Sequence, residues 1–438
     1  MLKKLFRLAV LLMLFIGIGY GIIFTVKRNI PEISQKEIDT KIFAMIQTKT
    51  ADATSFYTYG KSFNLKGKIS NINKDNFESV KLVITNGNDY EKEYNLGYSF
   101  EESYLKFTSN EEINNGVVID ELTDSEYYIL LRLKLNNSIE PKYYSFNNES
   151  NLKNIEYYTV TKNGKNKKAE IGFLKKNLNK KEYDLLTIKL KEEDLPEDVY
   201  DIVIDAGHGG TDKGEKSGNI TEADIALEYA ILLKRALEES GFKVKLTRDE
   251  SNSNLYTSTN MYDSNGRITS ACESKAKLMI SFHINQGNNE LKGLEIYSPC
   301  NSNLEFAKTM AKKIKEYSNI EYSNNNSFKE ANGVYVRNFT KSVIKEFENT
   351  ANRKGYEPYN ITTSTPYLYT IREVGGIATG AYVDGRNTAY SANKYYNSNQ
   401  GIECYQIELG YIKNDLDIIK NEKENYIRAI KEVICENY

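Results

Sequence analysis

The chain has 438 residues, which is long for a single domain and indicates two or three. Hydrophobic residues make up 40% of it, enough for ordinary cores, and the composition shows no collagen-like or low-complexity bias. The formal net charge of −2 and the pI of about 6.1 exclude the basic surface that is typical of nucleic-acid-binding proteins. We therefore expect globular domains and no nucleic-acid partner.

The first 29 residues predict a transmembrane anchor. Residues 8–26 carry no charge, and about 20 apolar residues suffice for a helix to cross a bilayer. Three basic residues precede this run and two follow it, which favours a single-pass protein in the cell membrane with its N-terminus inside and the remainder outside. A cleaved signal peptide is the alternative, but the apolar run is long for one and GIGYGIIF offers no clear cleavage site.

The next part of the chain predicts a polar, partly helical stalk at 30–60 and a β-rich extracytoplasmic domain at 61–197. Short β-branched or aromatic stretches such as VKLVIT and YYILLRLKL are separated by turns such as NGND and KNGKN. Their number and spacing favour an antiparallel sandwich, immunoglobulin-like in a loose sense. No motif in this domain indicates chemistry, so it can be a spacer or a glycan-binding surface built on tyrosine rings.

Residues 198–438 predict a different architecture. The buried strand VYDIVIDA leads to a helix that starts at Thr221, with TEAD as its capping box. Strands at 242–248, 278–285, 293–299 and 404–410 then alternate with helices that begin near residues 267 and 303. This alternation predicts an α/β fold with a doubly wound, mostly parallel sheet and flanking helices.

Four side chains are expected at one edge of this sheet. His208 and His283, the only histidines of the chain, and Glu408 each follow or end a predicted strand, and Glu222 opens the helix after the first strand. Reactive groups of such sheets gather beyond the carboxyl ends of the strands. Taken singly, each histidine is more often simply hydrogen-bonded, and Glu222 is more often a partner of the helix dipole. Their joint placement favours a site.

Two imidazoles and one carboxylate form the ligand set of a catalytic zinc ion, with a fourth position left for water. We therefore predict that Zn²⁺ is the cofactor, with His208, Glu222 and His283 as its ligands and zinc-activated water as the nucleophile. Glu408 is the candidate general base and acid. A dinucleotide site is not indicated because G-x-G-x-x-G is absent, and a serine hydrolase is not indicated because G-x-S-x-G is absent.

The blocks DAGHGGTDKG, TEADIALEYAILLKRALEESGFKVKLTR, SFHIN and IELGYIKNDLD together resemble the zinc-dependent N-acetylmuramoyl-L-alanine amidases of the family 3 type. The resemblance covers about residues 198–438. It implies that the zinc ligands of the family match His208, Glu222 and His283, and that its catalytic glutamate matches Glu408. It also implies hydrolysis of the amide between N-acetylmuramic acid and L-alanine in peptidoglycan.

This chain departs from the family pattern in a few places. Ala206 stands where proline is common, which should be tolerated, and the stretch at about 318–400 is a long insertion. The insertion can shape a substrate groove, occlude the metal until a partner arrives, or be a surface elaboration. Within it, Arg372 and Arg386 can meet carboxylates of the stem peptide, although solvated surface positions are the default expectation.

Three further questions stay open at this level. The cysteines Cys272, Cys300, Cys404 and Cys435 are interpreted as structural or free thiols, with any disulfide pairing undetermined. The enzymatic alternative to an amidase is a zinc peptidase that cleaves elsewhere on the stem peptide. The non-enzymatic alternative is a wall-binding scaffold that has kept an amidase-like fold. A protein activator is conceivable, but nothing in the sequence identifies one.

Overall fold

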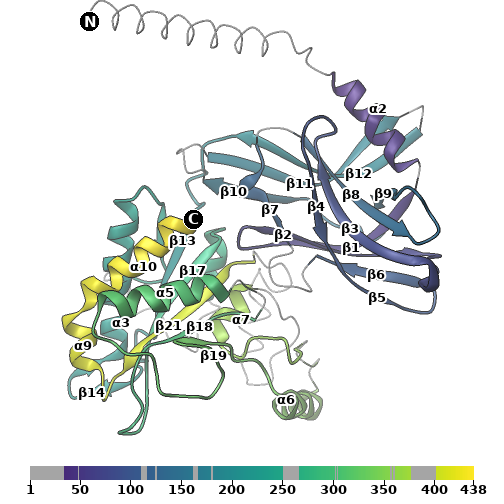
Figure 1. Cartoon of the computed structure of the whole chain (residues 1–438). Helices are drawn as coiled ribbons and strands as arrows, with labels where there is room; N and C mark the ends of the chain where they lie inside the picture. Colours follow the sequence, from purple (N-terminus) through teal and green to yellow (C-terminus); the bar gives the residue numbers. More distant parts are fainter. Residues whose placement is uncertain are drawn as a thin grey trace, which may run out of the picture.

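The computed structural model consists of a β-rich region followed by an α/β region (Figure 1). It describes residues 34–47, 49–109, 116–123, 126–160, 166–178, 181–249, 266–300, 302, 304–355, 358, 361–375 and 401–438. The expected anchor at 1–29 lies outside these residues. No helix within the described ranges is long and apolar enough to cross a membrane.

The β-rich region consists of one hydrogen-bonded network of strands preceded by helix α2 (Gln35–Ile46). The strands are β1 (Thr50–Tyr59), β2 (Ser62–Ser70), β3 (Phe77–Thr85), β4 (Glu91–Asn95), β5 (Gly97–Phe100), β6 (Tyr104–Thr108), β7 (Val117–Val118), β8 (Glu126–Leu135), β9 (Lys142–Asn147), β10 (Ile155–Val160), β11 (Asn166–Leu178) and β12 (Lys181–Glu192), with the short helices η1 (Lys74–Asn76) and η2 (Ile119–Glu121). Among these strands every pairing is antiparallel except that of β1 with β9.

Within the described residues, the segment expected to be a stalk is part of this folded region. Strand β1 occupies residues 50–59, and Ile42 and Ile46 of α2 are fully buried against the sheet beside Val83 and Leu130. A polar stalk is not what residues 50–59 form, because side chains along TADATSFYTY alternate between buried and more exposed positions, as in a strand on a core. The inward residues of this strand pack in the same core as the other strands.

The α/β region contains a seven-stranded sheet in the order β16-β13-β17-β21-β18-β20-β19. Its strands are β13 (Ile202–Ala206), β16 (Val244–Leu246), β17 (Leu278–Asn285), β18 (Glu295–Tyr297), β19 (Lys329–Ala331), β20 (Val334–Tyr335) and β21 (Glu403–Tyr411), and a separate ribbon pairs β14 (Lys216–Ser217) with β15 (Ile220–Thr221). The four strands from β16 to β21 are mutually parallel, whereas β18 is antiparallel to β21. The prediction of a mostly parallel α/β sheet after a β-rich region is thus confirmed.

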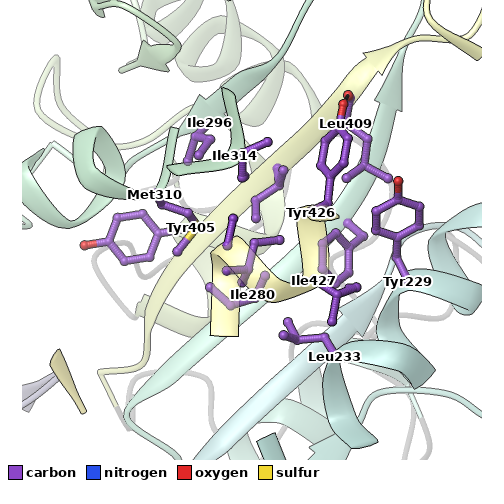
Figure 2. Packing of buried hydrophobic residues seen from close by; sticks show 14 of the residues in the cluster. Tyr229, Leu233, Ile280, Ile296, Met310, Ile314, Tyr405, Leu409, Tyr426 and Ile427 are labelled. Carbon is purple, nitrogen blue, oxygen red and sulfur yellow. Dashed lines mark hydrogen bonds between the residues drawn. The ribbon is translucent and has the colours of Figure 1, made fainter. Parts of the chain in front are cut away.

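Helices cover both faces of this sheet. The helices are α3 (Glu222–Glu238), α4 (Arg267–Glu273), α5 (Leu304–Tyr317), α6 (Lys341–Lys354), α7 (Tyr369–Gly375), α9 (Leu416–Asn421) and α10 (Lys423–Asn437). On one face, α3, α5 and α10 enclose a core in which Tyr229, Ile280 and Tyr426 are buried (Figure 2). On the other face, α4 and α7 share a second core with the sheet.

Parts of the predicted insertion are integral to this domain. Strands β19 and β20 extend the sheet beyond β18, and Ile361, Ile371 and Val374 are buried in the second core. A purely superficial elaboration is therefore the wrong description for these segments. Residues 376–400, including Arg386, lie outside the described part of the chain.

The two regions contact each other at the end of the sheet where β17 and β21 begin. The amide N–H of Gly60, in the turn between β1 and β2, donates to the carbonyl of Gly401 at 2.7 Å. The ammonium group of Lys277, just before β17, lies 3.6 Å from the carboxylate of Asp120 in η2. Lys61 lies over the ring of Tyr438 at 4.2 Å. The β-rich region is thus attached to the end of the sheet opposite to the carboxyl ends of its parallel strands.

Candidate metal centre

His208 lies in the turn that follows strand β13, at the carboxyl edge of the sheet. Its backbone φ of 60° is in the left-handed region, and Gly209 and Gly210 after it also have positive φ values of 121° and 61°. A side chain with a β-carbon is strained in this conformation, so the tight turn is expected to need glycines on the C-terminal side of the histidine. The turn carries the imidazole back over the end of the sheet.

Glu222 is the first residue of helix α3, whose N-terminus returns to the same edge. Thr221 caps this helix, since its hydroxyl accepts from the amide of Asp224 at 3.2 Å. The N-cap half of the capping box predicted from TEAD is therefore present, while the carboxylate of Asp224 accepts from the hydroxyl of Thr221 at 2.7 Å. The carboxylate of Glu222 is 2% exposed and accepts from the backbone amides of Ile284 and Glu215, both at 2.9 Å. Backbone amides thus fix the orientation of this buried carboxylate.

The three predicted ligands converge. The Nε2 atom of His208 and the Nδ1 atom of His283 each lie 3.0 Å from Oε1 of Glu222, and all three ligand atoms lie within 4.8 Å of one another. The two imidazole rings are 4.9 Å apart between centroids and inclined at 72°. His283 reaches this position from strand β17. Residues that are far apart in the sequence thus form a compact His–Glu–His group.

Two glycines make room for this group. A β-carbon on Gly207 would lie 2.5 Å from the ring of His283, and one on Gly214 would lie 2.4 Å from the carboxylate of Glu222. Such distances are shorter than any normal contact, so either substitution would displace a ligand. At these two positions the absence of a β-carbon therefore leaves the space that the ligand side chains occupy.

The donor set fits a zinc ion. Zinc bonds to nitrogen and oxygen ligands are about 2.0–2.2 Å long, which sets neighbouring ligand atoms roughly 3–4 Å apart. The two 3.0 Å separations approach that spacing. Nδ1 of His208 also lies 3.0 Å from the carboxylate of Asp212, the arrangement by which ligating histidines are usually oriented. Nε2 is then left as the metal-facing nitrogen.

Asp212 was missed by the sequence analysis. It lies four residues after His208 in the same glycine-rich turn, and its second carboxylate oxygen accepts from the amide of Gly214 at 3.1 Å. The signal was a carboxylate within the block DAGHGGTDKG. Because the path of that turn is irregular, spacing alone could not show that the carboxylate folds back onto the imidazole.

Proton affinities in this group follow from burial and mutual charge. Burial by itself would raise the pKa of Glu222, but hydrogen bonds and charge attraction from the two histidines lower it well below the usual range. Burial opposes protonation of both imidazoles. At His283 burial prevails and the pKa is lowered, whereas at His208 Glu222 and Asp212 together raise the pKa. The glutamate therefore stays ionised, as a metal ligand must.

Glu408 lies on strand β21, beside the metal group. It is the direct neighbour of His283 in the pairing of β17 with β21, and it is 7% exposed. The side-chain amide of Gln406 donates to its Oε1 at 2.7 Å. Burial, followed by the negative charges of Glu222 and Glu295, raises the pKa of Glu408 to about 8. Among the residues that the structure describes, Oε2 of Glu408 has no hydrogen-bond donor.

The remaining predicted features of this domain are Arg372 and the cysteines. Arg372 is 4% exposed and donates to Glu373 at 2.8 Å and to the carbonyl of Tyr367 at 2.6 Å, so the expectation of a solvated arginine was wrong. It is a buried structural group. All four cysteines are free thiols, and Cys272 and Cys404 are buried.

Fold and site define a mostly parallel α/β domain with a His–Glu–His metal-binding group at the carboxyl edge of its sheet. Residues 202–360 match the family model of N-acetylmuramoyl-L-alanine amidases, and this part of the chain is a domain of that family. The match ends before Glu408, so the placement of that residue depends on the structure.

Among curated proteins, the chain is 36% identical over 91 residues to the germination-specific N-acetylmuramoyl-L-alanine amidase of Bacillus subtilis. It is 38% identical over 95 residues to an endolysin of Bacillus phage SPP1. These matches cover 19% and 22% of this chain, and the chain spans 38% and 32% of the two relatives. Among solved structures, the amidase AmiC2 of Nostoc punctiforme shares 19% identity with a TM-score of 0.32, over 54% of this chain and 94% of that one.

Proposed function

We propose that the α/β domain is a zinc-dependent N-acetylmuramoyl-L-alanine amidase. Its substrate would be peptidoglycan, and the bond cut would be the amide between the lactyl group of N-acetylmuramic acid and L-alanine. The convergence of His208, Glu222 and His283 within 4.8 Å carries the proposal. The family match at 202–360 supports this choice of bond.

Each site residue has a distinct task in this proposal. His208, Glu222 and His283 hold the zinc ion through Nε2, a carboxylate oxygen and Nδ1. When bound, zinc polarises water and the carbonyl oxygen of a substrate, which lowers the barrier to hydrolysis. The amides of Ile284 and Glu215 and the carboxylate of Asp212 keep the ligands oriented.

Glu408 moves the proton. Its Oε1 accepts from Gln406, which leaves Oε2 to take a proton from the attacking water. The same carboxyl group then delivers that proton to the leaving nitrogen of L-alanine. A pKa raised to about 8 suits a group that must both accept and donate a proton near neutral pH.

Digestion of purified peptidoglycan, with and without a chelator, tests the proposal. We expect the zinc-loaded protein to release peptides that begin with L-alanine and to leave intact glycan strands, as followed by mass spectrometry. Peptides cut at an inner bond would instead identify a zinc peptidase. Zinc-loaded protein that binds the wall but clears none of it would identify a scaffold.

A pair of variants separates proton transfer from metal binding. Glu408→Ala should abolish peptide release while the zinc content stays unchanged, because Glu408 is not among the ligands. His283→Ala should lose both the bound zinc and the activity. Full activity of Glu408→Ala would contradict the role assigned to this glutamate.

We also propose that the chain is anchored in the cell membrane with the amidase domain outside. The uncharged run at 8–26, with more basic residues before it than after it, supports this placement. Peptidoglycan lies on that side of the membrane. Fractionation of cells that express the full chain should recover it with membranes, and a chain lacking residues 1–29 should be recovered without them.

A further inference from the structure

A second buried glutamate lies beside the proposed proton carrier. Glu295, on strand β18, is directly opposite Glu408 in the antiparallel pairing of β18 with β21. Side chains of such a pair leave the sheet on the same face, with β-carbons about 4.5–5.5 Å apart. Glu295 is 0% exposed. Two carboxyl groups are thus buried next to each other at the edge of the metal centre.

Neutral donors surround Glu295. The hydroxyl groups of Tyr411 and Ser323 donate to its Oε1 at 2.6 and 2.7 Å, and the amide of Asn325 donates to the same atom at 3.3 Å. The hydroxyl of Tyr297 donates to Oε2 at 2.9 Å. Four donors thus fix the position of the Glu295 carboxyl group.

The backbone is shaped to complete this arrangement. On β17, His283 and Asn285 are two residues apart, but their partners on β21, Glu408 and Tyr411, are three residues apart. Strand β21 therefore carries one residue more than β17 at this point, which is a β-bulge. Such a bulge re-aims the side chains that follow it. It accounts for Tyr411 reaching Glu295 on the same face as Glu408. Asp415 fixes the bulge by accepting from the amide of Tyr411 at 2.8 Å.

We propose that Glu295 is a positioning residue for Glu408: its side chain, fixed by four donors directly opposite Glu408, acts with the hydrogen bond from Gln406 to hold Glu408 in place as the proton carrier. This inference rests on the proposed amidase activity. Glu295 touches neither the metal ligands nor, in this proposal, the substrate.

The test compares Glu295→Gln with Glu403→Gln in the zinc-loaded full chain. Glu403 is a half-buried glutamate on the same strand β21, and it accepts from Tyr405 at 2.6 Å and from Tyr438 at 3.1 Å, at the opposite end of the sheet. Both substitutions remove a carboxyl group that accepts hydrogen bonds from tyrosines. Only Glu295→Gln removes one beside Glu408.

We expect Glu295→Gln to lower kcat by about 10- to 100-fold, with KM and zinc content unchanged. Removing a group that supports an active-site residue, or displacing that residue slightly, has an effect of about this size. Glu295→Asp, which keeps the carboxyl group, should recover part of kcat. Glu403→Gln should keep kcat even if it unfolds at a lower temperature. If Glu295→Gln fails to fold, Tyr411→Phe provides the same test with a smaller loss of kcat.

Two results would overturn the inference. One is an unchanged kcat in a folded, zinc-loaded Glu295→Gln protein. The other is a loss of activity that follows thermal stability equally in the Glu295 and Glu403 variants. An inactive wild-type protein would instead refute the amidase function itself, so the two failures are distinguishable.

Discussion

At the residue scale, a buried ion pair behind the site is important for stability. Asp205, at the end of β13, accepts from Nε of Arg267 at 2.7 Å and from the hydroxyl groups of Thr247 and Ser281 at 2.6 and 2.7 Å. Asp205 and Arg267 are 0% and 2% exposed. Their bonds connect β13, β17, α4 and the residue that follows β16, close to the metal centre.

Asp205→Asn should therefore destabilise the α/β domain strongly. Removing one member of a buried pair leaves the other charge without compensation, which typically costs about 3–5 kcal/mol. Urea unfolding of the zinc-free protein would measure the change in the free energy of unfolding. Asp224→Asn, a substitution at a more exposed aspartate on α3, serves as the control and should cost much less.

The same carboxylate predicts a loss of stability in acid. Burial alone would raise the pKa of Asp205, but Arg267 and the two hydroxyl groups lower it well below the usual range. The folded protein therefore binds this proton less readily than the unfolded chain, whose Asp pKa is about 3.9. Stabilisation by Asp205 is complete above about pH 4 and is lost as the pH falls towards the folded pKa.

Unfolding measured between neutral and strongly acidic pH would check this prediction. The wild-type protein should lose stability more steeply below about pH 4 than Asp205→Asn, since Asp has an unfolded pKa near that value. Parallel curves for the two proteins would show that other carboxylates dominate the acid response.

At the element scale, helix α3 connects local capping with metal binding. Its N-cap Thr221 immediately precedes the ligand Glu222, so a frayed first turn would displace the carboxylate. We expect Thr221→Ala to lower the free energy of unfolding by about 1 kcal/mol. We also expect it to weaken zinc binding about tenfold, as seen when groups that orient a ligand are removed.

Two controls isolate the role of this cap. Thr221→Ser keeps the hydroxyl group and should retain zinc affinity. Thr340 caps α6 in the same way, accepting from Val343, but α6 carries no ligand. Thr340→Ala should therefore reduce stability without altering zinc affinity, as measured by competition with a chromogenic chelator. Equal effects on zinc from both alanine variants would contradict the proposed coupling.

Most of the α/β elements could be predicted from periodicity. Strand β17 occupies the predicted residues 278–285, and helix α5 ends at the predicted Tyr317. Helix α10 was missed although YIRAIKEVI has helical spacing, because the predicted set of elements ended with the last strand. Its buried face, which includes Tyr426 and Ile430, completes the first core.

At the scale of the whole molecule, the site and the interface between the two regions lie at opposite ends of the sheet. Lys277 precedes β17 whereas His283 lies near its end, and six residues of extended strand span about 20 Å. The β-rich region therefore contacts the α/β domain without covering the metal centre. This placement favours the interpretation of the β-rich region as a spacer, with the metal centre of the α/β domain facing away from it.

Gly401→Ala tests this arrangement. Gly401 has a φ of 65°, and a β-carbon there would lie 1.7 Å from the carbonyl oxygen of Thr58, which is backbone and cannot swing away. The substitution should separate the unfolding of the two regions into distinct calorimetric transitions. Activity on soluble muropeptides should persist, because the metal centre is remote from the contact.

Gly355→Ala is the matched control for backbone strain. Gly355 has a similar φ of 70°, but nothing lies within 4 Å of a β-carbon placed there. It should therefore show only the cost of a left-handed alanine and keep the wild-type pattern of transitions. If both variants behave alike, strain rather than the interface explains the effect.

The sequence by itself determined the metal group. Only two histidines exist, one follows a buried strand and the other lies near the end of one, and the carboxyl ends of parallel strands must share one edge. Tertiary structure alone decided the roles of Asp212 and Glu295, whose contacts depend on an irregular turn, a β-bulge and the register between two antiparallel strands. It also decided that residues 50–59 form a strand of the core and that Arg372 is buried. Burial of polar residues depends on which partners the rest of the chain brings to them.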